Sequence, residues 1–212
     1  MKSKKNITSI ITGDIVHSRQ TETTLWLPKL KKALSVEGKS PRVWQVYRGD
    51  SFQLEVNDPA MSLLAAIRIK ATTKTIKDLD VRMAIGIGEK KFTSHEIIES
   101  DGEAFIYSGE TFETLKKTRR NLAIKTPWTH FDRDMNVLLQ LASIPMDDWT
   151  PGSAELIQLL IENPEFTQEE LAKKLGLTQP SVSERQNRSH FEVIMEMEKL
   201  YREKIITLVT AK

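Results

Sequence analysis

A β-hairpin pattern near residue 50 organises the first part of the chain. Two short segments rich in β-branched and aromatic residues flank the sequence Arg48-Gly49-Asp50-Ser51, whose residue types favour a tight turn. A strand and a helix precede this hairpin, and a helix and a strand follow it, which is the split-βαβ plan of a ferredoxin-like sheet. The expected strands are 6–16, 43–47, 52–56, 81–87 and 121–125, and the expected helices are 24–36, 59–73 and 103–119.

The segment 144–153, with the sequence IPMDDWTPGS, interrupts the helical pattern on both of its sides. It contains two prolines, a glycine and two adjacent aspartates, which are typical of a connection between domains. We therefore predict an α+β fold in two domains: a ferredoxin-like domain at residues 1–145, followed by an all-α domain at residues 146–212.

The pattern after residue 153 is typical of a helix-turn-helix. Thr167 and Glu170 have the spacing of a capping box, and Gly176 supplies a turn residue that tolerates positive φ. Thr178 is expected to cap the next helix. The stretch 167–188 resembles bacterial helix-turn-helix sequences, in which the start of the second helix reads duplex DNA.

Charge around this second helix favours DNA as a partner. Between residues 171 and 191, four basic residues accompany one acidic residue. Short or forked donors suit base edges, and flanking basic side chains suit phosphates. The expected DNA-binding residues are Lys174, Gln179, Ser181, Ser183, Arg185 and Arg188. The alternative is a helical bundle for protein contacts, and the apolar stripe of the last helix, 189–208, is expected to pack in a core or a dimer.

Two aspartates follow glycines at the expected strand ends. In a split-βαβ sheet the first strand lies beside the hairpin, so the carboxylates of Asp14 and Asp50 are expected to converge. Opposed carboxylates favour a cation, and oxygen ligands suit Mg²⁺ or Mn²⁺ bound together with nucleotide phosphates. The metal ligands would be Asp14 and Asp50, and the surrounding ligand-binding residues would be Gly13, Ile15, Arg19, Arg48, Gly49 and Ser51. The alternative is that each aspartate only stabilises its own turn.

Four motifs carry a family resemblance: ITGDIVHSR at 11–19, RGDSFQ at 48–53, RMAIGIG at 82–88 and DGEAFIYSG at 101–109. Together they resemble the SatD family of bacterial proteins and, more remotely, the catalytic domain of class III nucleotidyl cyclases. The resemblance implies a cyclase- or palm-like sheet in which Asp14 and Asp50 bind two metal ions over a nucleoside triphosphate. Val46 replaces the base-reading Lys of cyclases that use ATP, and Ile106 and Glu110 replace their charge-stabilising Asn and Arg. The resemblance therefore implies a metal or nucleotide site without efficient cyclisation.

Composition excludes several classes of protein. The 212 residues contain no Cys and nearly balanced charges, with 31 Lys+Arg against 29 Asp+Glu, so a disulfide-built scaffold is excluded. No apolar run approaches the roughly eighteen residues of a membrane span. The basic start at residues 1–5 is not followed by the apolar segment of a signal peptide, so we expect a cytoplasmic protein.

These features predict a ligand-sensing, DNA-binding transcriptional regulator. In this interpretation, a homodimer senses a nucleotide or a phosphorylated ligand with a degenerate cyclase-like domain and responds through its helix-turn-helix. One alternative is a metal-dependent, nucleotide-processing enzyme with an accessory helix-turn-helix, and another is a non-enzymatic adaptor for protein contacts. The regulator is preferred because the DNA-binding pattern is intact, whereas the catalytic set is depleted.

Overall fold

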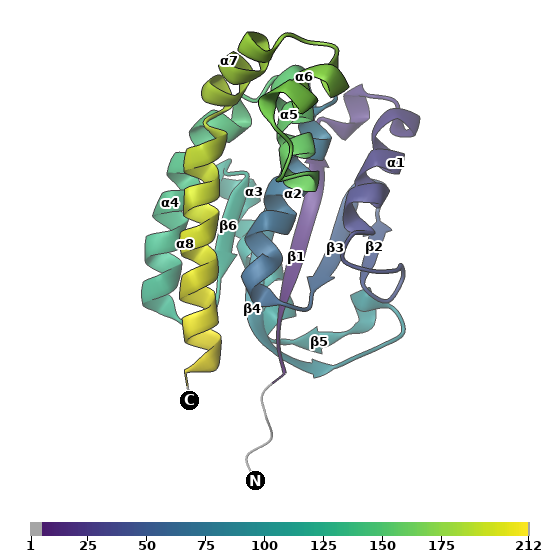
Figure 1. Cartoon of the computed structure of the whole chain (residues 1–212). Helices are drawn as coiled ribbons and strands as arrows, with labels where there is room; N and C mark the ends of the chain where they lie inside the picture. The colour runs from purple at the N-terminus through teal and green to yellow at the C-terminus, as the bar shows by residue number, and fades with distance from the viewer. Residues whose placement is uncertain (1–5, 212) are drawn as a thin grey trace.

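The computed structural model describes residues 6–211, which form one sheet with helices on both faces (Figure 1). The basic start at residues 1–5 lies outside the described residues. The strands are β1 Ile7–Val16, β2 Trp44–Tyr47, β3 Ser51–Val56, β4 Asp80–Phe92, β5 Asp101–Gly102 and β6 Leu122–Lys125. The α-helices are α1 Thr23–Leu34, α2 Ser62–Lys74, α3 Glu103–Thr118, α4 Thr129–Asp147, α5 Pro151–Glu162, α6 Gln168–Leu175, α7 Gln179–Ser189 and α8 Phe191–Thr210. The prediction of an α+β protein is confirmed.

The sheet has the strand order β2-β3-β1-β4-β5, and β6 pairs with β4 outside this path. The pairs along the path are antiparallel, whereas β6 runs parallel to β4. Because β1 pairs with both β3 and β4, it lies in the middle of the sheet, and its end is next to the β2–β3 turn. The strand expected at 81–87 is longer than predicted, since β4 continues to Phe92.

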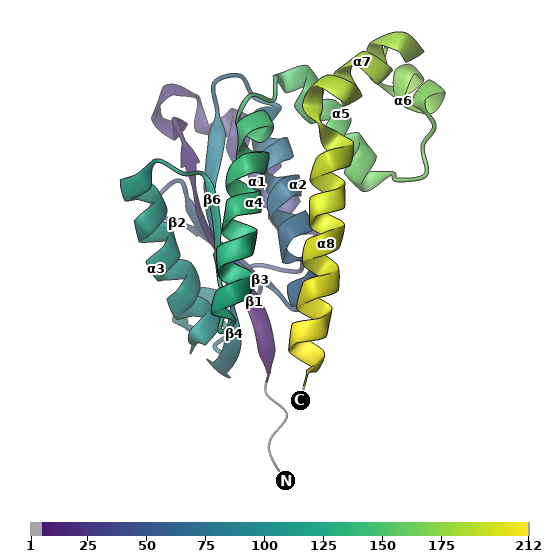
Figure 2. The same cartoon turned by 90° about the vertical axis from the view of Figure 1, so that its left-hand side faces the viewer.

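Alternate residues of β1 face two different cores. Ile11 and Ile15 pack in the main core with α1 and α2, whereas Ile10 packs with Ala104 of α3. Helix α3 covers one face of the sheet, and α2, α4 and α8 lie on the other side (Figure 2). Helix α3 approaches β4 closely because Gly86 has no side chain: a Cβ there would lie 2.2 Å from the Ala104 carbonyl oxygen. The glycine-rich segment of β4 therefore serves helix packing.

Helix α4 continues through the position of the expected domain boundary. The prediction of an interrupted helical pattern at 144–153 is wrong for residues 144–147, which form the last turn of α4 with Pro145 inside it. Met146 of this turn is fully buried in the main core, and this apolar packing opposes the cost of a proline within a helix. The connection from α4 to α5 is therefore only residues 148–150.

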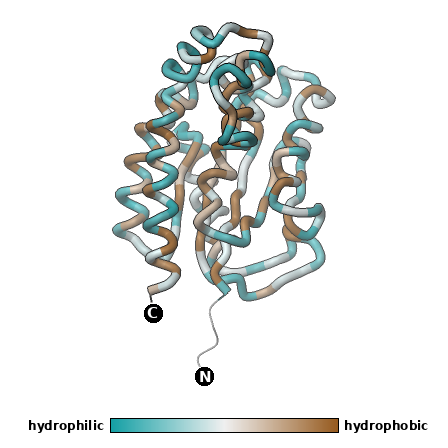
Figure 3. The backbone as a smooth tube through the Cα atoms, in the orientation of Figure 1, coloured by the Kyte–Doolittle hydropathy of each residue, from teal (hydrophilic) through white to brown (hydrophobic). Residues whose placement is uncertain are grey.

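The helices after this connection contribute to two cores. Helix α8 buries Ile194, Tyr201 and Ile205 in the main core under the sheet. Figure 3 shows hydrophobic residues recurring along α8 between hydrophilic ones. By contrast, α5, α6 and α7 share a separate core around Leu156 and Val182. Among the described residues, no helix is both long and apolar enough to cross a membrane.

Candidate functional site

A row of polar side chains crosses four strands at one end of the sheet. The strand register pairs Asp14 of β1 with Ser51 of β3 and with Arg82 of β4, and it pairs Ser51 with Tyr47 of β2. Directly paired residues project to the same face of a sheet. Thr12, two residues before Asp14, donates a hydrogen bond to Ser108 of α3 at 3.0 Å. We call four of these side chains the polar row: Tyr47, Ser51, Asp14 and Arg82. Because Asp14 projects to the same face as Thr12, the polar row lies on the face of the sheet that α3 covers.

Asp14 is incompletely compensated in this row. Its Oδ2 lies 3.7 Å from Nη1 of Arg82, which is close enough for ionic attraction but too long for a hydrogen bond. Asp14 Oδ1 and Arg82 Nε are both buried and have no hydrogen-bond partner among the described residues. Burial raises the pKa of the Asp14 carboxyl, the charges of Arg82 and Lys116 oppose this, and the charge of Asp50 adds to it. The row thus contains a buried acceptor and a buried donor that are both unpaired.

Asp50 lies beside Asp14, as the sequence predicts. Its backbone carbonyl accepts a hydrogen bond from Ile15 N at 3.1 Å, which joins the hairpin turn to the end of β1. Its Oδ2 accepts a bond from the Ser18 hydroxyl at 2.5 Å. Arg48 and Gly49 in this turn have positive φ values of 51° and 90°. The glycine is needed here because such backbone conformations strain most other residues.

The other predicted ligand residues have different positions. Arg19, Arg48 and Gly49 are exposed at the same end of the sheet, and Ser51 is half-buried within the polar row. Gly13 and Ile15 face the opposite side. A Cβ on Gly13 would lie 2.5 Å from the Phe52 ring, and Ile15 is buried in the main core, so both residues serve packing.

Sequence reasoning missed the side chains that complete the row. Arg82 is the only charged residue in the apolar segment 81–87, and antiparallel pairing of this strand with β1 would have placed it near Asp14. Burial raises the pKa of the Tyr47 hydroxyl, Arg48 opposes this, and Asp14 and Glu113 add to it. Glu113 and Lys116 of α3 therefore act electrostatically on the row.

Helix α3 acts on the row through Glu113 and Lys116, which lie three and six residues after Glu110, the later of the two positions suggested by the cyclase resemblance. Ile106 is 51% exposed, and Glu110 forms an exposed ion pair with Lys125 at 2.7 Å. Lys116 contacts Glu113 at 3.1 Å and lies over the Phe112 ring, 4.4 Å from its centroid. The position of positive charge thus differs from the one that the resemblance implies.

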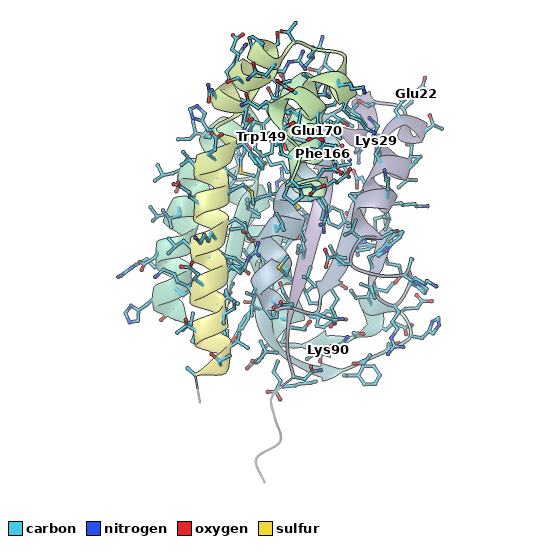
Figure 4. All side chains as sticks on the ribbon, viewed as in Figure 1. Glu22, Lys29, Lys90, Trp149, Phe166 and Glu170 are labelled. Carbon is cyan, nitrogen blue, oxygen red and sulfur yellow. The ribbon has the colours of Figure 1, made fainter. Side chains whose placement is uncertain are left out.

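The three-helix unit α5–α7 has the caps that the sequence predicts. Both hydrogen bonds of the capping box between Thr167 and Glu170 are present, and Gly176 ends α6 with φ 66°. Bonds from the backbone N–H and the hydroxyl of Thr167 lower the pKa of the exposed Glu170 carboxyl. The Thr178 side chain caps α7 by accepting from Ser181 N. The indole N–H of Trp149 donates to the Ser189 carbonyl at 3.0 Å, where α7 meets α8 (Figure 4).

The expected DNA-binding residues are not equally free to contact a partner. Lys174 and Gln179 are exposed, and so is Arg188, which pairs with Glu184 at 2.6 Å. Gln179 donates to the side chain of Gln168 at 2.8 Å. Ser181 bonds the capping hydroxyl, and Ser183 is half-buried.

Arg185 differs from the other five expected DNA-binding residues. Its Nη1 donates to the Gly152 carbonyl at 3.4 Å, so its guanidinium lies against the first turn of α5. The side chain is only partly exposed in this position. Arg185 therefore joins α7 to α5.

The fold and the site define an α+β protein with a polar row at one sheet end and a capped three-helix unit. A family model described as the SatD family matches residues 8–205, from β1 to the last turns of α8. The chain belongs to the SatD family. A comparison with curated proteins finds none that matches.

Proposed function

We propose that this protein is a ligand-sensing, DNA-binding transcriptional regulator in which α6 and α7 form a helix-turn-helix. The observation that carries the proposal is α7 itself. Its N-terminus is capped by Thr178, its Val182 is buried against α5 and α6, and its first residue, Gln179, is exposed. Helix-turn-helix proteins present the start of their second helix to the major groove in this way.

The exposed residues divide into two roles. Gln179 at the start of α7 has the amide group that pairs well with adenine edges. Lys174 at the end of α6 and Arg188 at the end of α7 suit phosphates, which fix the position of a protein on DNA. Arg185 is a positioning residue in this arrangement, because it holds α7 against the first turn of α5.

The sheet is proposed to be the sensor. The order β2-β3-β1-β4 with antiparallel pairs supports a ferredoxin-like fold of the cyclase or palm type, since split-βαβ units have this strand order. The polar row and Asp50 then occupy the end of the sheet that the resemblance assigns to a nucleotide. The buried and unpaired Asp14 Oδ1 and Arg82 Nε support a ligand that brings both a cation and an anion.

A resident metal ion held by protein groups alone is not supported. Among the described residues, no group of three or more His, Asp or Glu side chains is arranged to hold a metal ion. Asp50 also already accepts the Ser18 hydroxyl. A Mg²⁺ or Mn²⁺ ion that arrives with nucleotide phosphates needs fewer protein ligands, and Asp14 with Asp50 would suffice for it.

Helix α8 is proposed to transmit the state of the sheet to α7. It follows α7 directly and buries Tyr201 against η2, the 3-10 helix Pro59–Met61. A shift of this contact would therefore move the DNA-binding helix as well. This arrangement favours a sensor over an adaptor with independent parts.

One observation favours a second candidate, a metal-dependent enzyme acting on nucleotides. Arg82 and Lys116 both place positive charge near Asp14, and phosphoryl transfer needs such charge. Turnover of ATP or GTP at rates typical of enzymes would support this candidate against the regulator.

The DNA part is tested by selecting binding sites from randomised duplexes and measuring affinity by fluorescence anisotropy at several salt concentrations. Gln179→Ala should weaken binding to the selected site roughly tenfold while changing unrelated DNA little. Lys174→Ala should weaken binding to all DNA sequences similarly and should reduce the slope of log affinity against log salt concentration by about one. Lys199→Ala, an exposed lysine of α8, is the matched control. Equal affinity of Gln179→Ala and wild type for the selected site contradicts the proposal.

The sensor part is tested by thermal unfolding with nucleotide and Mg²⁺ added singly and together. Binding to the folded state should raise Tm as the nucleotide concentration exceeds Kd. The double variant Asp14→Asn/Asp50→Asn should lose this effect, and Asp101→Asn, an exposed carboxylate of β5, should keep it. Stabilisation that persists in the double variant would exclude the two aspartates as ligands.

A further inference from the structure

A small cavity lies where α1, α2 and α5 meet, away from the polar row. Its volume is about 180 Å³, below the roughly 300–1,000 Å³ of typical pockets for drug-sized ligands, so it suits a small ion. Three basic side chains line it: Lys29 and Lys32 of α1, of which Lys29 is labelled in Figure 4, and Arg68 of α2. Glu162, the last residue of α5, is the acidic residue of the lining.

Two polar groups of this lining are buried and unpaired. Thr72 of α2 is only 4% exposed, and its hydroxyl has no hydrogen-bond partner within residues 6–211. The same is true of Nε of Arg68, one turn earlier on the same helix. Buried polar groups are normally hydrogen-bonded, because leaving them unpaired costs free energy. Both groups can donate, and residues four apart share one face of a helix, so one acceptor in the cavity can reach both.

Two carboxylates close to the cavity leave these donors unused. Glu37 pairs with Nη2 of Arg68, which holds the guanidinium in place while its Nε stays unpaired among the described residues. Glu162 is exposed and accepts a bond from Gln158, one turn earlier on α5, at 3.1 Å. Against these two carboxylates, the three cations of the lining leave an excess of one positive charge, which favours an anion.

The two lysines add donors from a second helix. Lys29 donates to the Thr75 hydroxyl at 3.0 Å, which leaves two of its three N–H donors. Lys32 is exposed and forms no ion pair in the described part of the chain. Donors on both α1 and α2 suit an anion whose oxygens point in several directions, as those of a phosphate do, better than the two coplanar oxygens of a carboxylate.

We propose that this cavity binds a phosphate-type oxyanion, either free phosphate or the terminal phosphate of a small molecule. Arg68 and Thr72 donate to it from α2, and Lys29 and Lys32 neutralise its charge from α1. Hydrogen bonds to an ionised acceptor are stronger than neutral ones, which favours the anion over water in the same place. This site is separate from those of the proposed function, because its lining contains neither polar-row residues nor expected DNA-binding residues.

Calorimetric titration of the full chain in a phosphate-free buffer tests this site. The probes are inorganic phosphate and glycerol 3-phosphate, with sodium chloride at equal ionic strength as the control. We expect one phosphate per chain with a Kd of about 1 mM or lower, and an increase in Tm that chloride does not produce. Tighter binding of inorganic phosphate assigns the free ion, and tighter binding of glycerol 3-phosphate assigns a phosphate monoester.

Thr72→Val is the most informative variant, because it removes a hydroxyl that has no partner among the described residues. Without phosphate its Tm should equal or exceed that of the wild type, since a buried unpaired group is lost. Its affinity for phosphate should fall roughly fivefold. Thr73→Val is the matched control: the Thr73 hydroxyl donates to the Ile69 carbonyl at 2.9 Å and lies outside the lining, so the affinity should be kept.

Two charge variants test the cations. Lys32→Gln should weaken phosphate binding roughly fivefold. Its matched control, Lys31→Gln, changes an exposed neighbour outside the lining and should have little effect. Arg68→Lys keeps a positive charge for Glu37 but lacks the planar fork with its Nε–H, so it should weaken binding roughly tenfold. Thermal unfolding of each variant shows that it is folded.

Three outcomes overturn the proposal. The first is the absence of both binding heat and an increase in Tm with either phosphate probe in the wild type. The second is unchanged affinity in folded Thr72→Val, because the phosphate then binds elsewhere. The third is an equal loss of affinity in Lys31→Gln and Lys32→Gln, which indicates general attraction to the basic surface of α1.

Discussion

Tyr201→Phe measures how firmly α8 is attached to the rest of the protein. The Tyr201 hydroxyl is buried, donates to the Pro59 carbonyl at 2.7 Å and lies 2.5 Å from the Ser62 hydroxyl. Removing it leaves these buried groups with fewer partners, which costs about 1–2 kcal/mol. For a chain of this size, that corresponds to a decrease in Tm of roughly 2–8 °C.

Calorimetry and urea unfolding at pH 7 check this magnitude, with Tyr107→Phe on α3 as a half-buried control that should change stability by less than about 0.5 kcal/mol. The pH dependence provides an independent check. Burial raises the pKa of the Tyr201 hydroxyl above its ordinary 10.0, with the Ser62 hydrogen bond opposing this. The stabilisation by the hydroxyl should therefore be constant below pH 10 and decrease above it, because the unfolded chain then ionises first. An unchanged Tm in Tyr201→Phe would refute the hydrogen-bonded attachment of α8.

Three further predictions concern charge and assembly. Lys70→Met should destabilise the protein by about 3–5 kcal/mol in urea unfolding, because buried Lys70 bonds Asp80 at 2.7 Å and Asp147 at 2.6 Å, and adding Asp147→Asn should recover part of this loss. The pKa of Asp14 is raised in the folded chain, so ionisation of this carboxyl above about pH 4 opposes folding. Asp14→Asn should therefore increase the free energy of unfolding at pH 7 and make it fall less as the pH rises above 4; an unchanged pH profile would exclude this effect of Asp14. Sedimentation at micromolar concentration should give a dimer, and a particle of one chain, with and without DNA, would contradict the expected homodimer.

The sequence predicts best where local chemistry decides the structure. The hairpin turn at Arg48 and Gly49 adopts positive φ, and the capping box at Thr167 and Glu170 forms both of its hydrogen bonds. Both features depend on residues within a few positions of each other, so residue type and spacing are sufficient evidence for them. The family resemblance to SatD proteins, which rested on motifs, is confirmed.

The features that the sequence did not predict depend on contacts between distant segments. Arg82 lies beside Asp14 because of the register between β1 and β4, which no single segment reveals. Pro145 looks like the end of a helix, but burial of Met146 extends α4 beyond it. Arg185 has the spacing of a DNA-contacting residue, and its contact with Gly152 arises only when α7 packs on α5. In each case tertiary packing outweighs the local signal.

Helix α8 is also a rigid lever. Its twenty residues span about 30 Å, and the main core holds it from Ile194 to Ile205 on one side only. Tyr201 lies halfway along this helix, about 15 Å from its α7 end, so a tilt of about 11° about Tyr201 displaces that end by about 3 Å, which is the length of a hydrogen bond. A rearrangement at Tyr201 would therefore be large enough, at the α7 end, to move a side chain into or out of hydrogen-bond reach of the DNA that we propose α7 contacts.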